Sequence, residues 1–255
     1  MTSYGLIGFP IVQSSSVDYF TAKFQAEGLQ DFHYHLFPLQ EVSGLPALIA
    51  DNTSLCGLNV TIPHKVTVIP MLDKLDTTAA AVGAVNTIAI VRNYGNVSLE
   101  GYNTDVIGFE QSLLPLLRPG HKRALVLGTG GASKAVAYVL RNNNIPITFV
   151  SRNPKSQDQL RYEDISGKVL AAHSLIINTT PLGKYPHIST FPPLTYELLT
   201  SGHLLYDLNY IPELTRFMQL GSAKGATVMG GLRMLQLQAD AAWEIWKKHM
   251  LPFRK

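Results

Sequence analysis

A glycine-rich turn in the middle of the chain has the composition of a phosphate-binding loop. Residues 128–133 are Gly-Thr-Gly-Gly-Ala-Ser, between a short apolar run at 123–127 and a segment rich in Ala, Val and Leu at 134–142. A strand, a glycine turn and a helix in this order bring backbone N–H groups and the positive end of a helix dipole to one anion. Ser133 stands where the dinucleotide fingerprint has its third glycine, so the pattern favours a dinucleotide site but leaves a purely structural turn open. The residues predicted to bind the cofactor in this turn are Gly128, Thr129, Gly130, Gly131 and Ala132.

The segment after the next predicted strand, 147–150, bears on which dinucleotide is bound. An acidic residue here would accept hydrogen bonds from a ribose 2′-hydroxyl and would repel a 2′-phosphate. The chain has no acid at this point, and its planar Arg152 suits a phosphate dianion. NADP is therefore favoured over NAD, although Arg152 and Lys155 also fit ordinary solvated loop charges. The predicted contacts are Ser151, Arg152, Asn153 and Lys155.

Three polar side chains elsewhere are candidates for chemistry. Lys65 follows Pro63 in the first turn of a predicted helix, Asp105 precedes an apolar helix, and Gln238 lies inside an apolar helical stripe. A lysine can transfer a proton, and a buried amide needs hydrogen-bond partners. Structural roles stay open for all three: a solvated helix charge, a helix N-cap and a satisfied core glutamine.

These residues are positioned by strands and helices that alternate along the chain. Apolar runs predict strands at 4–8, 33–37, 57–61, 123–127, 147–150, 175–177 and 204–206, and helical spacing predicts helices at 17–27, from 63, from near 106, at 134–142 and from 233 to about 249. The pattern predicts an α/β fold with a parallel sheet and right-handed crossovers in its second half. We expect two domains, residues 1–105 with the C-terminal helix 233–255, and residues 106–232.

Composition excludes several classes of protein. Of 255 residues, 46% are hydrophobic and only 15% charged, against about 25% in typical domains, so the chain is not disordered. The net charge is +3 and no Lys/Arg block exceeds Lys247-Lys248, so a nucleic-acid partner is not expected. The single Cys56 excludes an intrachain disulfide. Residues 1–17 lack the basic start of a signal peptide, and the apolar stretch 77–91 is too short to cross a bilayer, so we expect a cytoplasmic protein without membrane contact.

Eight motifs, in order, resemble the shikimate dehydrogenase family over essentially the whole chain. They are Gly8-Phe-Pro-Ile11 with Ser14-Ser-Ser16, Asn59-Val-Thr-Ile-Pro-His-Lys65, Gly83-Ala-Val-Asn-Thr87, Asn103-Thr-Asp105 with Gly108, Gly128-Thr-Gly-Gly-Ala132, Asn178-Thr-Thr-Pro181, Tyr206-Asp-Leu-Asn-Tyr210, and Gly231-Leu-Arg-Met-Leu235 with Gln238.

The resemblance implies reversible reduction of the 3-dehydroshikimate ketone by NADPH to shikimate, on the route to aromatic amino acids. It implies an N-terminal substrate-binding domain, a C-terminal Rossmann-type NADP-binding domain and a cleft between them, in a monomer or homodimer without a metal. Lys65 and Asp105 would form the catalytic pair, and Ser14 and Ser16 would donate to the substrate carboxylate. The carboxylate or ring hydroxyls would be held by Asn59, Thr61, Asn86, Tyr210 and Gln238, and Thr179, Leu208 and Gly231 would join the cofactor contacts.

Departures from the family pattern lie outside the catalytic pair. Gln13 replaces a common His, Val17 a Pro, Lys184 a Met and Arg233 a small residue. In the cofactor loop, Ser151-Arg-Asn153 replaces the usual Asn-Arg-Thr, and Ser156 stands where the family has a later Arg. Two alternatives remain. One is a paralogue acting on quinate with NAD or NADP, and the other is a non-catalytic nucleotide-binding module, which retention of Lys65 and Asp105 disfavours.

Overall fold

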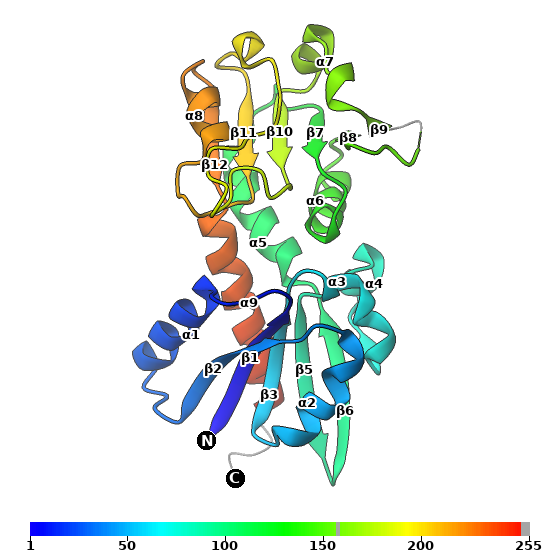
Figure 1. Cartoon of the computed structure of the whole chain (residues 1–255), viewed down its shortest axis with the longest axis vertical. Helices are drawn as coiled ribbons and strands as arrows, with labels where there is room; N and C mark the ends of the chain where they lie inside the picture. Colours follow the sequence, from blue (N-terminus) through cyan, green and yellow to red (C-terminus); the bar gives the residue numbers. More distant parts are fainter. Residues whose placement is uncertain (157–158, 251–255) are drawn as a thin grey trace. The chain divides into compact units, whose positions relative to one another are not determined.

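The structure is a computed structural model that describes residues 1–156 and 159–250. The chain forms two compact units (Figure 1), of which unit 1 comprises residues 1–108 with 236–255 and unit 2 comprises residues 109–235. The boundaries fall inside two helices, α5 (Thr104–Leu113) and α9 (Leu232–Met250). Each boundary lies three residues beyond the one expected from the sequence.

Unit 1 contains a mixed sheet in the order β2-β1-β3-β5-β6-β4. Its strands are β1 (Thr2–Gly8), β2 (Phe32–Pro38), β3 (Leu55–Val60), β4 (Lys74–Leu75), β5 (Thr87–Asn93) and β6 (Asn96–Tyr102). β1 pairs in parallel with β2 and β3, whereas β5 runs antiparallel to both β3 and β6. The strands predicted at 4–8, 33–37 and 57–61 are confirmed.

The hairpin of β5 and β6 is absent from the sequence-based prediction. Its two-residue turn is Tyr94-Gly95, and both residues have positive φ, 47° and 83°. Two positive φ angles are typical of the type I′ turn that matches the twist of a hairpin. Such turns usually carry Asn or Asp before the glycine, so a tyrosine at this position hides the turn from sequence reasoning.

The helices of unit 1 pack on this sheet around two hydrophobic clusters. They are α1 (Ser15–Ala26), α2 (Leu45–Asp51), α3 (His64–Thr67), α4 (Thr77–Val82) and the parts of α5 and α9 in this unit. The second cluster is aromatic and includes Tyr4, Phe20 and Trp246, all almost fully buried. Trp246 donates its Nε1–H to Ile88 O (3.0 Å) and lies against Gly57, where a Cβ would clash with the indole nitrogen. Because Gly57 has no side chain, α9 packs directly against β3. The last helix thus packs on the first domain, as the sequence predicted.

Unit 2 contains a parallel sheet in the order β12-β11-β10-β7-β8-β9. Its strands are β7 (Ala124–Leu127), β8 (Ile147–Val150), β9 (Gln159–Leu160), β10 (Leu175–Asn178), β11 (Leu204–Asp207) and β12 (Thr227–Gly230), and its complete helices are α6 (Gly131–Asn142), α7 (Gly167–Ala172) and α8 (Arg216–Ser222). All neighbouring strands pair in parallel, as the arrows of β7, β10 and β11 in Figure 1 show. This order is that of the Rossmann fold, which confirms the predicted class.

The helix predicted at residues 134–142 begins three residues earlier than expected. α6 starts at Gly131, and Gly130 is its N-cap residue. The glycine turn therefore runs directly into the helix, which brings the first-turn N–H groups next to the turn. In the described part of the chain, no helix is both long enough and apolar enough to cross a membrane.

Candidate active site and cofactor-binding edge

Lys65 and Asp105 form a largely buried ion pair in unit 1. Lys65 Nζ lies 2.6 Å from Asp105 Oδ2, and the side chains are only 16% and 9% exposed. The other carboxylate oxygen, Oδ1, accepts a hydrogen bond from Asn86 Nδ2 at 2.8 Å. Asp105 is thus held from both sides, and Lys65 is not the solvated helix charge that the sequence left open. An ammonium beside a fixed carboxylate can donate a proton to a nearby oxygen and can stabilise negative charge there.

The start of α5 explains how Asp105 is aimed. Asn103 Oδ1 accepts a hydrogen bond from Val106 N (3.3 Å), and Asn103 Nδ2 donates to Ala84 O (2.8 Å). Asn103 therefore caps the helix and ties it to the segment before β5. The capping role considered for Asp105 belongs to Asn103, which leaves the Asp105 carboxylate available for Lys65.

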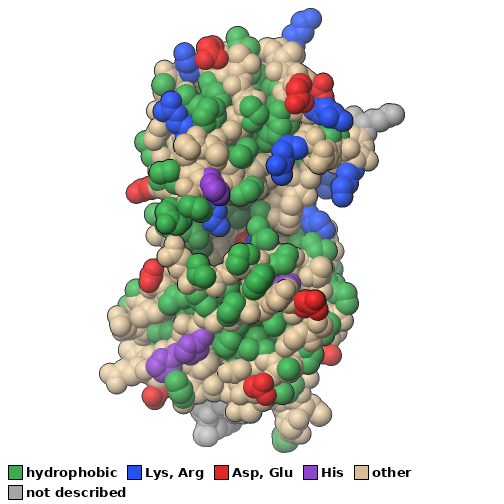
Figure 2. Space-filling view, in the orientation of Figure 1, with side chains coloured by type: hydrophobic (Ala, Val, Ile, Leu, Met, Phe, Trp, Pro, Cys, Tyr) green, Lys and Arg blue, Asp and Glu red, His purple; other side chains and the backbone are tan. Residues whose placement is uncertain are grey.

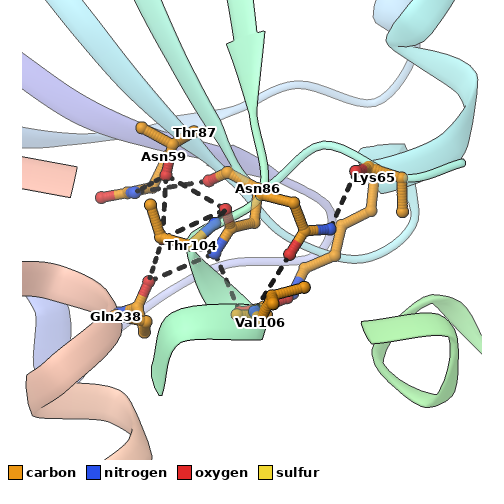
Figure 3. A network of polar contacts seen from close by, with 10 residues as sticks. Asn59, Lys65, Asn86, Thr87, Thr104, Val106 and Gln238 are labelled. Atoms are coloured by element: carbon orange, nitrogen blue, oxygen red, sulfur yellow. Dashed lines mark hydrogen bonds and ion pairs between the residues drawn. The ribbon is translucent and has the colours of Figure 1, made fainter. Parts of the chain in front are cut away.

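Asn86 connects the ion pair to the rest of a polar cluster (Figure 3). Its Oδ1 accepts a hydrogen bond from Thr104 N (2.7 Å), while its Nδ2 faces Thr104 Oγ1 (2.9 Å) as well as Asp105. Because a backbone N–H can only donate, this contact fixes which end of the amide points toward Asp105.

Gln238 reaches the same cluster from α9 (Figure 3). Its Oε1 lies 3.4 Å from both Asn86 Nδ2 and Thr104 Oγ1. Trp246, which anchors α9 on the sheet, follows eight residues later and so lies on the same face of the helix. The helix that packs on the core thus also delivers Gln238 to the polar cluster.

Asn59 lies on the sheet side of the cluster and makes bonds within the protein. Its Nδ2 donates to Thr87 Oγ1 (3.2 Å) and Asn86 O (3.3 Å), and its Oδ1 accepts from the Tyr34 hydroxyl (2.7 Å). Burial raises the pKa of Tyr34, which keeps this hydroxyl a donor. With both amide hydrogens engaged, Asn59 retains one acceptor position for a ligand.

Two serines lie at the start of α1, and a threonine follows the end of β3. Ser14 is the N-cap of α1, where its Oγ accepts from Ser16 N (3.2 Å) and its own proton stays available to donate. Ser16 is buried, and its hydroxyl bonds to that of Tyr34. Thr61 directly follows β3 and donates its N–H to Ile7 O (2.9 Å).

The structure therefore joins five of the predicted residues, Asn59, Lys65, Asn86, Asp105 and Gln238, in one hydrogen-bonded network, to which Ser14 and Ser16 connect through Tyr34. Tyr210 belongs to unit 2, in the segment after β11.

The predicted cofactor residues follow the carboxyl ends of the parallel strands in unit 2. The last residues of five strands are in register: Val150 pairs with Leu127, Leu127 with Asn178, Asn178 with Asp207, and Asp207 with Gly230. The next residues along each strand are Gly128, Ser151, Thr179, Leu208 and Gly231. In open α/β sheets a ligand binds beyond this edge, at the point where the strand order reverses, which here lies between β7 and β10.

Two of these glycines permit a close approach of the backbone. Gly128 has φ +104°, and a Cβ there would lie 2.7 Å from Thr179 Oγ1. A Cβ on Gly231 would clash with Leu208 O. By contrast, apart from the residues next to Gly130 in the chain, no atom of the described residues lies within 4 Å of the place of a Cβ there. The open space at the N-terminus of α6 fits a pyrophosphate, whose charge the helix dipole favours.

The segment after β8 is open to solvent and basic. Arg152, Asn153 and Lys155 are exposed, and neither cation forms an ion pair with a described residue. Asn153 N donates to Ser151 Oγ at 3.2 Å, which folds the segment back on the strand end. An exposed guanidinium beside a ribose site fits the 2′-phosphate of NADP.

Charge is divided unequally between the two units. Residues 109–235 contain 13 Lys and Arg against 7 Asp and Glu, whereas the rest of the chain contains 8 against 11. Most of the Lys and Arg side chains on the face in Figure 2 lie over elements of unit 2. The excess of positive charge favours an anionic ligand on this unit.

The sequence analysis missed three residues that hold the assigned site residues in place by hydrogen bonds. Thr87 and Thr104 are fully buried and bond to Asn86, and Tyr34 joins Ser16 to Asn59. The two threonines lie inside motifs quoted above, Gly83 to Thr87 and Asn103 to Asp105. Each is next to an assigned residue, and this position was the only sequence feature that could have indicated its role. The residues described form no group of three or more side chains suited to a metal ion.

Known proteins share both the sequence and the fold of this chain. The family model for the shikimate dehydrogenase substrate binding domain matches residues 6–88. The shikimate dehydrogenase (NADP(+)) of Desulforamulus reducens is 35% identical over 272 residues, covering 97% of this chain and 90% of that protein.

Solved structures agree along almost the whole chain. Shikimate 5-dehydrogenase from Thermus thermophilus, in complex with NADP(H) and shikimate, is 31% identical with a TM-score of 0.81, covering 97% of this chain and 94% of that one. The ligand-free 5-ketofructose reductase of Gluconobacter sp. strain CHM43 is 29% identical with a TM-score of 0.78, covering 96% and 92%. Because motifs, fold and sequence agree over nine-tenths of a relative 35% identical to it, the chain belongs to the shikimate dehydrogenase family.

Proposed function

We propose that the protein catalyses the reversible, NADP-dependent interconversion of 3-dehydroshikimate and shikimate, in the shikimate pathway. The observation that carries the proposal is the buried Lys65–Asp105 pair, fixed by Asn86, in a chain related over its length to shikimate dehydrogenases (NADP(+)). In the direction of reduction, the ketone carbon gains a hydride and the ketone oxygen gains a proton. NADPH supplies the hydride when bound.

Lys65 supplies the proton. Its ammonium faces Asp105 Oδ2, so the lysine side chain is held in one place and its charge is compensated before substrate binds. As negative charge develops on the ketone oxygen, the ammonium stabilises that charge and protonates the oxygen. In the reverse direction a neutral Lys65 accepts the proton of the shikimate hydroxyl. Asp105 orients the lysine, and Asn86 orients Asp105.

The neighbouring polar side chains bind the substrate. Ser14 donates its hydroxyl hydrogen to the substrate carboxylate, and Ser16 does so by turning its hydrogen away from Tyr34. Thr61, Asn86, Gln238 and Tyr210 bind ring hydroxyls. Asn59 contributes chiefly by shaping the cluster, because its amide hydrogens bond to Thr87 and to the Asn86 backbone.

The strand ends of unit 2 bind the dinucleotide. The Gly128–Ala132 turn and the N-terminus of α6 hold the pyrophosphate, while Thr179, Leu208 and Gly231 border the nicotinamide half. Ser151, Arg152, Asn153 and Lys155 bind the adenosine 2′-phosphate, with the Arg152 guanidinium as the main discriminator against NAD.

An assay of four combinations tests the proposal directly. Purified protein is offered shikimate or quinate as the substrate and NADP+ or NAD+ as the oxidant, and reduced cofactor is followed by its absorbance. We expect shikimate with NADP+ to give the highest kcat/KM. Higher kcat/KM with quinate would support the paralogue. Reduction of 5-ketofructose without oxidation of shikimate would move the chain to the activity named for its Gluconobacter neighbour.

Two further assignments complete the proposal. The protein acts in the cytoplasm, in agreement with its single cysteine. It works as a monomer or homodimer, which sedimentation at several protein concentrations distinguishes.

A further inference from the structure

Asp207 is a buried carboxylate that the proposed chemistry does not use. It ends β11, has no exposed surface, and forms no ion pair with a described cation. Three donors lie close to it: Thr215 Oγ1 is 2.7 Å from Oδ2, and Asn178 Nδ2 and Asn209 N are each 3.0 Å from Oδ1. A buried charge compensated only by hydrogen bonds is costly, which points to a role beyond packing.

The three donors come from different segments of unit 2. Asn178 ends β10, Asn209 follows β11 by two residues, and Thr215 is the N-cap of α8, accepting from Met218 N at 3.4 Å. The Asp207 carboxylate therefore joins two strand ends to the start of a helix.

The same asparagines shape the segment after β10. Asn178 Oδ1 accepts from the N (3.0 Å) and Oγ1 (2.6 Å) of Thr180. Asn209 Nδ2 donates to Thr180 O and Leu182 O, each at 3.0 Å. Thr179 lies between residues that are bonded on both sides, so its position follows from this network.

Two more contacts extend the network along the sheet edge. Leu208 N donates to Asn178 O (3.0 Å), and Gly231 N donates to Asn209 O (3.0 Å). Gly231 in turn fits against the Leu208 carbonyl because it has no Cβ. The proposed cofactor contacts held in this way are Thr179, Leu208 and Gly231.

We propose that Asp207 is a positioning residue for the cofactor: as a carboxylate it gathers the ends of β10, β11 and β12 into the arrangement that binds NADP, and its protonation weakens NADP binding. The inference rests on the proposed function, because it takes these strand ends as the cofactor site.

The chemistry of the partners favours the ionised form. Asn178 Nδ2 and Asn209 N can only donate, so a protonated Asp207 keeps all three bonds only if its proton lies on Oδ2 and is donated to Thr215 Oγ1, whose own hydrogen must then turn away. Burial raises the pKa of Asp207 to about 6, against the lowering effect of its bonds to Thr215, Asn209 and Asn178. The binding-competent carboxylate thus prevails above about pH 6 and is lost as the pH falls through that value.

Fold stability responds with the opposite sign. Because the pKa of Asp207 is higher in the folded than in the unfolded chain, protonation favours the folded state, and this contribution is lost as the pH rises through about 6. The titratable group that faces the carboxylate from the segment beside α7 is the buried Tyr196 hydroxyl, whose pKa is raised chiefly by burial and further by Asp207. The charged residues near the start of α8, Glu213 and Arg216, are exposed.

The main test compares NADP+ dissociation constants, measured by calorimetry from about pH 5 to about pH 8, for the wild type and Asp207→Asn. The variant keeps the shape of the side chain and cannot titrate. We expect it to bind NADP+ about tenfold more weakly than wild type at the alkaline end, and the difference to shrink as the pH falls through about 6. The 2′-phosphate of NADP titrates in the same range in both proteins, so the difference between the two profiles isolates Asp207. Asp164→Asn, at an exposed acid of unit 2, is the matched control and should follow the wild-type profile.

A second variant tests the direction of the effect. Thr215→Val removes a bond that lowers the pKa of Asp207, so the acid limb of NADP+ binding should move to higher pH, and Thr215→Ser should restore it. Identical pH profiles for the wild type and Asp207→Asn overturn the inference, as does a variant that loses thermal stability yet keeps its NADP+ affinity. If the wild type binds no NADP+ at any pH, the cofactor assignment itself fails, and this inference fails with it.

Discussion

The polar cluster of unit 1 and the strand-end edge of unit 2 use different chemical groups, side chains in the first and mainly backbone in the second. In unit 1 the candidate chemistry lies in side chains, Lys65, Asp105 and Asn86, which are buried and already bonded to one another. In unit 2 the candidate contacts are largely backbone groups and glycines at the ends of parallel strands, with exposed cations beside them.

The difference suits the two tasks proposed for these regions. Proton transfer requires one ammonium held at a defined place, which a network of mutually fixed side chains provides. A dinucleotide is a long anion, and a row of N–H groups at a helix start binds it without a dedicated charge at every contact. Substitutions in unit 1 should therefore act mainly on turnover or on substrate affinity, whereas substitutions in unit 2 should act mainly on cofactor affinity.

The largest effect is expected for Lys65→Met. Removing the proton donor should lower kcat by about 10² to 10⁴, with a much smaller change in the KM for shikimate, because the interaction lost belongs to the transition state. Asp105→Asn should be similarly slow, since it removes the charge that holds the lysine. The matched control is Lys74→Met, which breaks an exposed ion pair with Glu100 and should leave kcat unchanged. If the Lys65→Met enzyme keeps more than about a tenth of wild-type kcat, the proton donor is a bound water and not Lys65.

The next effect concerns binding of the substrate carboxylate. The double variant Ser14→Ala, Ser16→Ala should raise the dissociation constant for shikimate by at least about 10²-fold, because each hydrogen bond to a charged group contributes about 1.5–3 kcal/mol. NADP+ affinity, measured by calorimetry, should stay near the wild-type value. Ser15→Ala serves as the control between them, and loss of the Ser14 cap should appear separately as about 1 kcal/mol of stability. Unchanged shikimate affinity would place the carboxylate elsewhere.

A smaller effect distinguishes the two cofactors. Arg152→Ala should weaken NADP+ binding by about 1.5–3 kcal/mol while leaving NAD+ binding nearly unchanged, because only NADP carries the 2′-phosphate. Arg141→Ala, at an exposed arginine in the last turn of α6, controls for the general loss of positive charge on unit 2. Equal losses for both cofactors would remove Arg152 from the 2′-phosphate site.

Sequence reasoning reached unit 2 more directly than unit 1, for a physical reason. A strand, a glycine turn and a helix are consecutive in the sequence, so the edge at Gly128–Ala132 follows from local pattern alone. Lys65 and Asp105 are 40 residues apart, and their meeting depends on the order β3-β5-β6 and on Asn103 as the cap of α5. Local pattern gave each of them an ordinary structural role, and only the family resemblance joined them.

Two features of the fold could not be predicted from the sequence, the β5–β6 hairpin and the hydrogen bonds around Asp207. Tyr94 adopts a positive φ without belonging to the residue types that usually do, which hid the β5–β6 hairpin. Asp207 stands at the end of an apolar run and gave no sign of the three donors, drawn from positions 178, 209 and 215, that surround it. Hydrogen-bond partners that come together only in the folded chain produce no regular spacing in the sequence, so sequence patterns do not reveal them.

The smallest effect tests whether the edge of unit 2 is built from backbone, by comparing two glycines two residues apart. Gly128 has φ +104° and little room beside Thr179, so Gly128→Ala should cost about 1–2 kcal/mol of unfolding free energy. Gly130 has φ −81° and open space around the place of a Cβ, so Gly130→Ala should change stability by less than about 0.5 kcal/mol. Its methyl group would nevertheless occupy the space assigned to the pyrophosphate, so NADP+ affinity should fall although the fold is intact. Urea unfolding and calorimetry on the same preparations measure both quantities. Wild-type NADP+ affinity in Gly130→Ala would show that the pyrophosphate does not lie at the start of α6, because a backbone-built anion site leaves no room for a side chain at its centre.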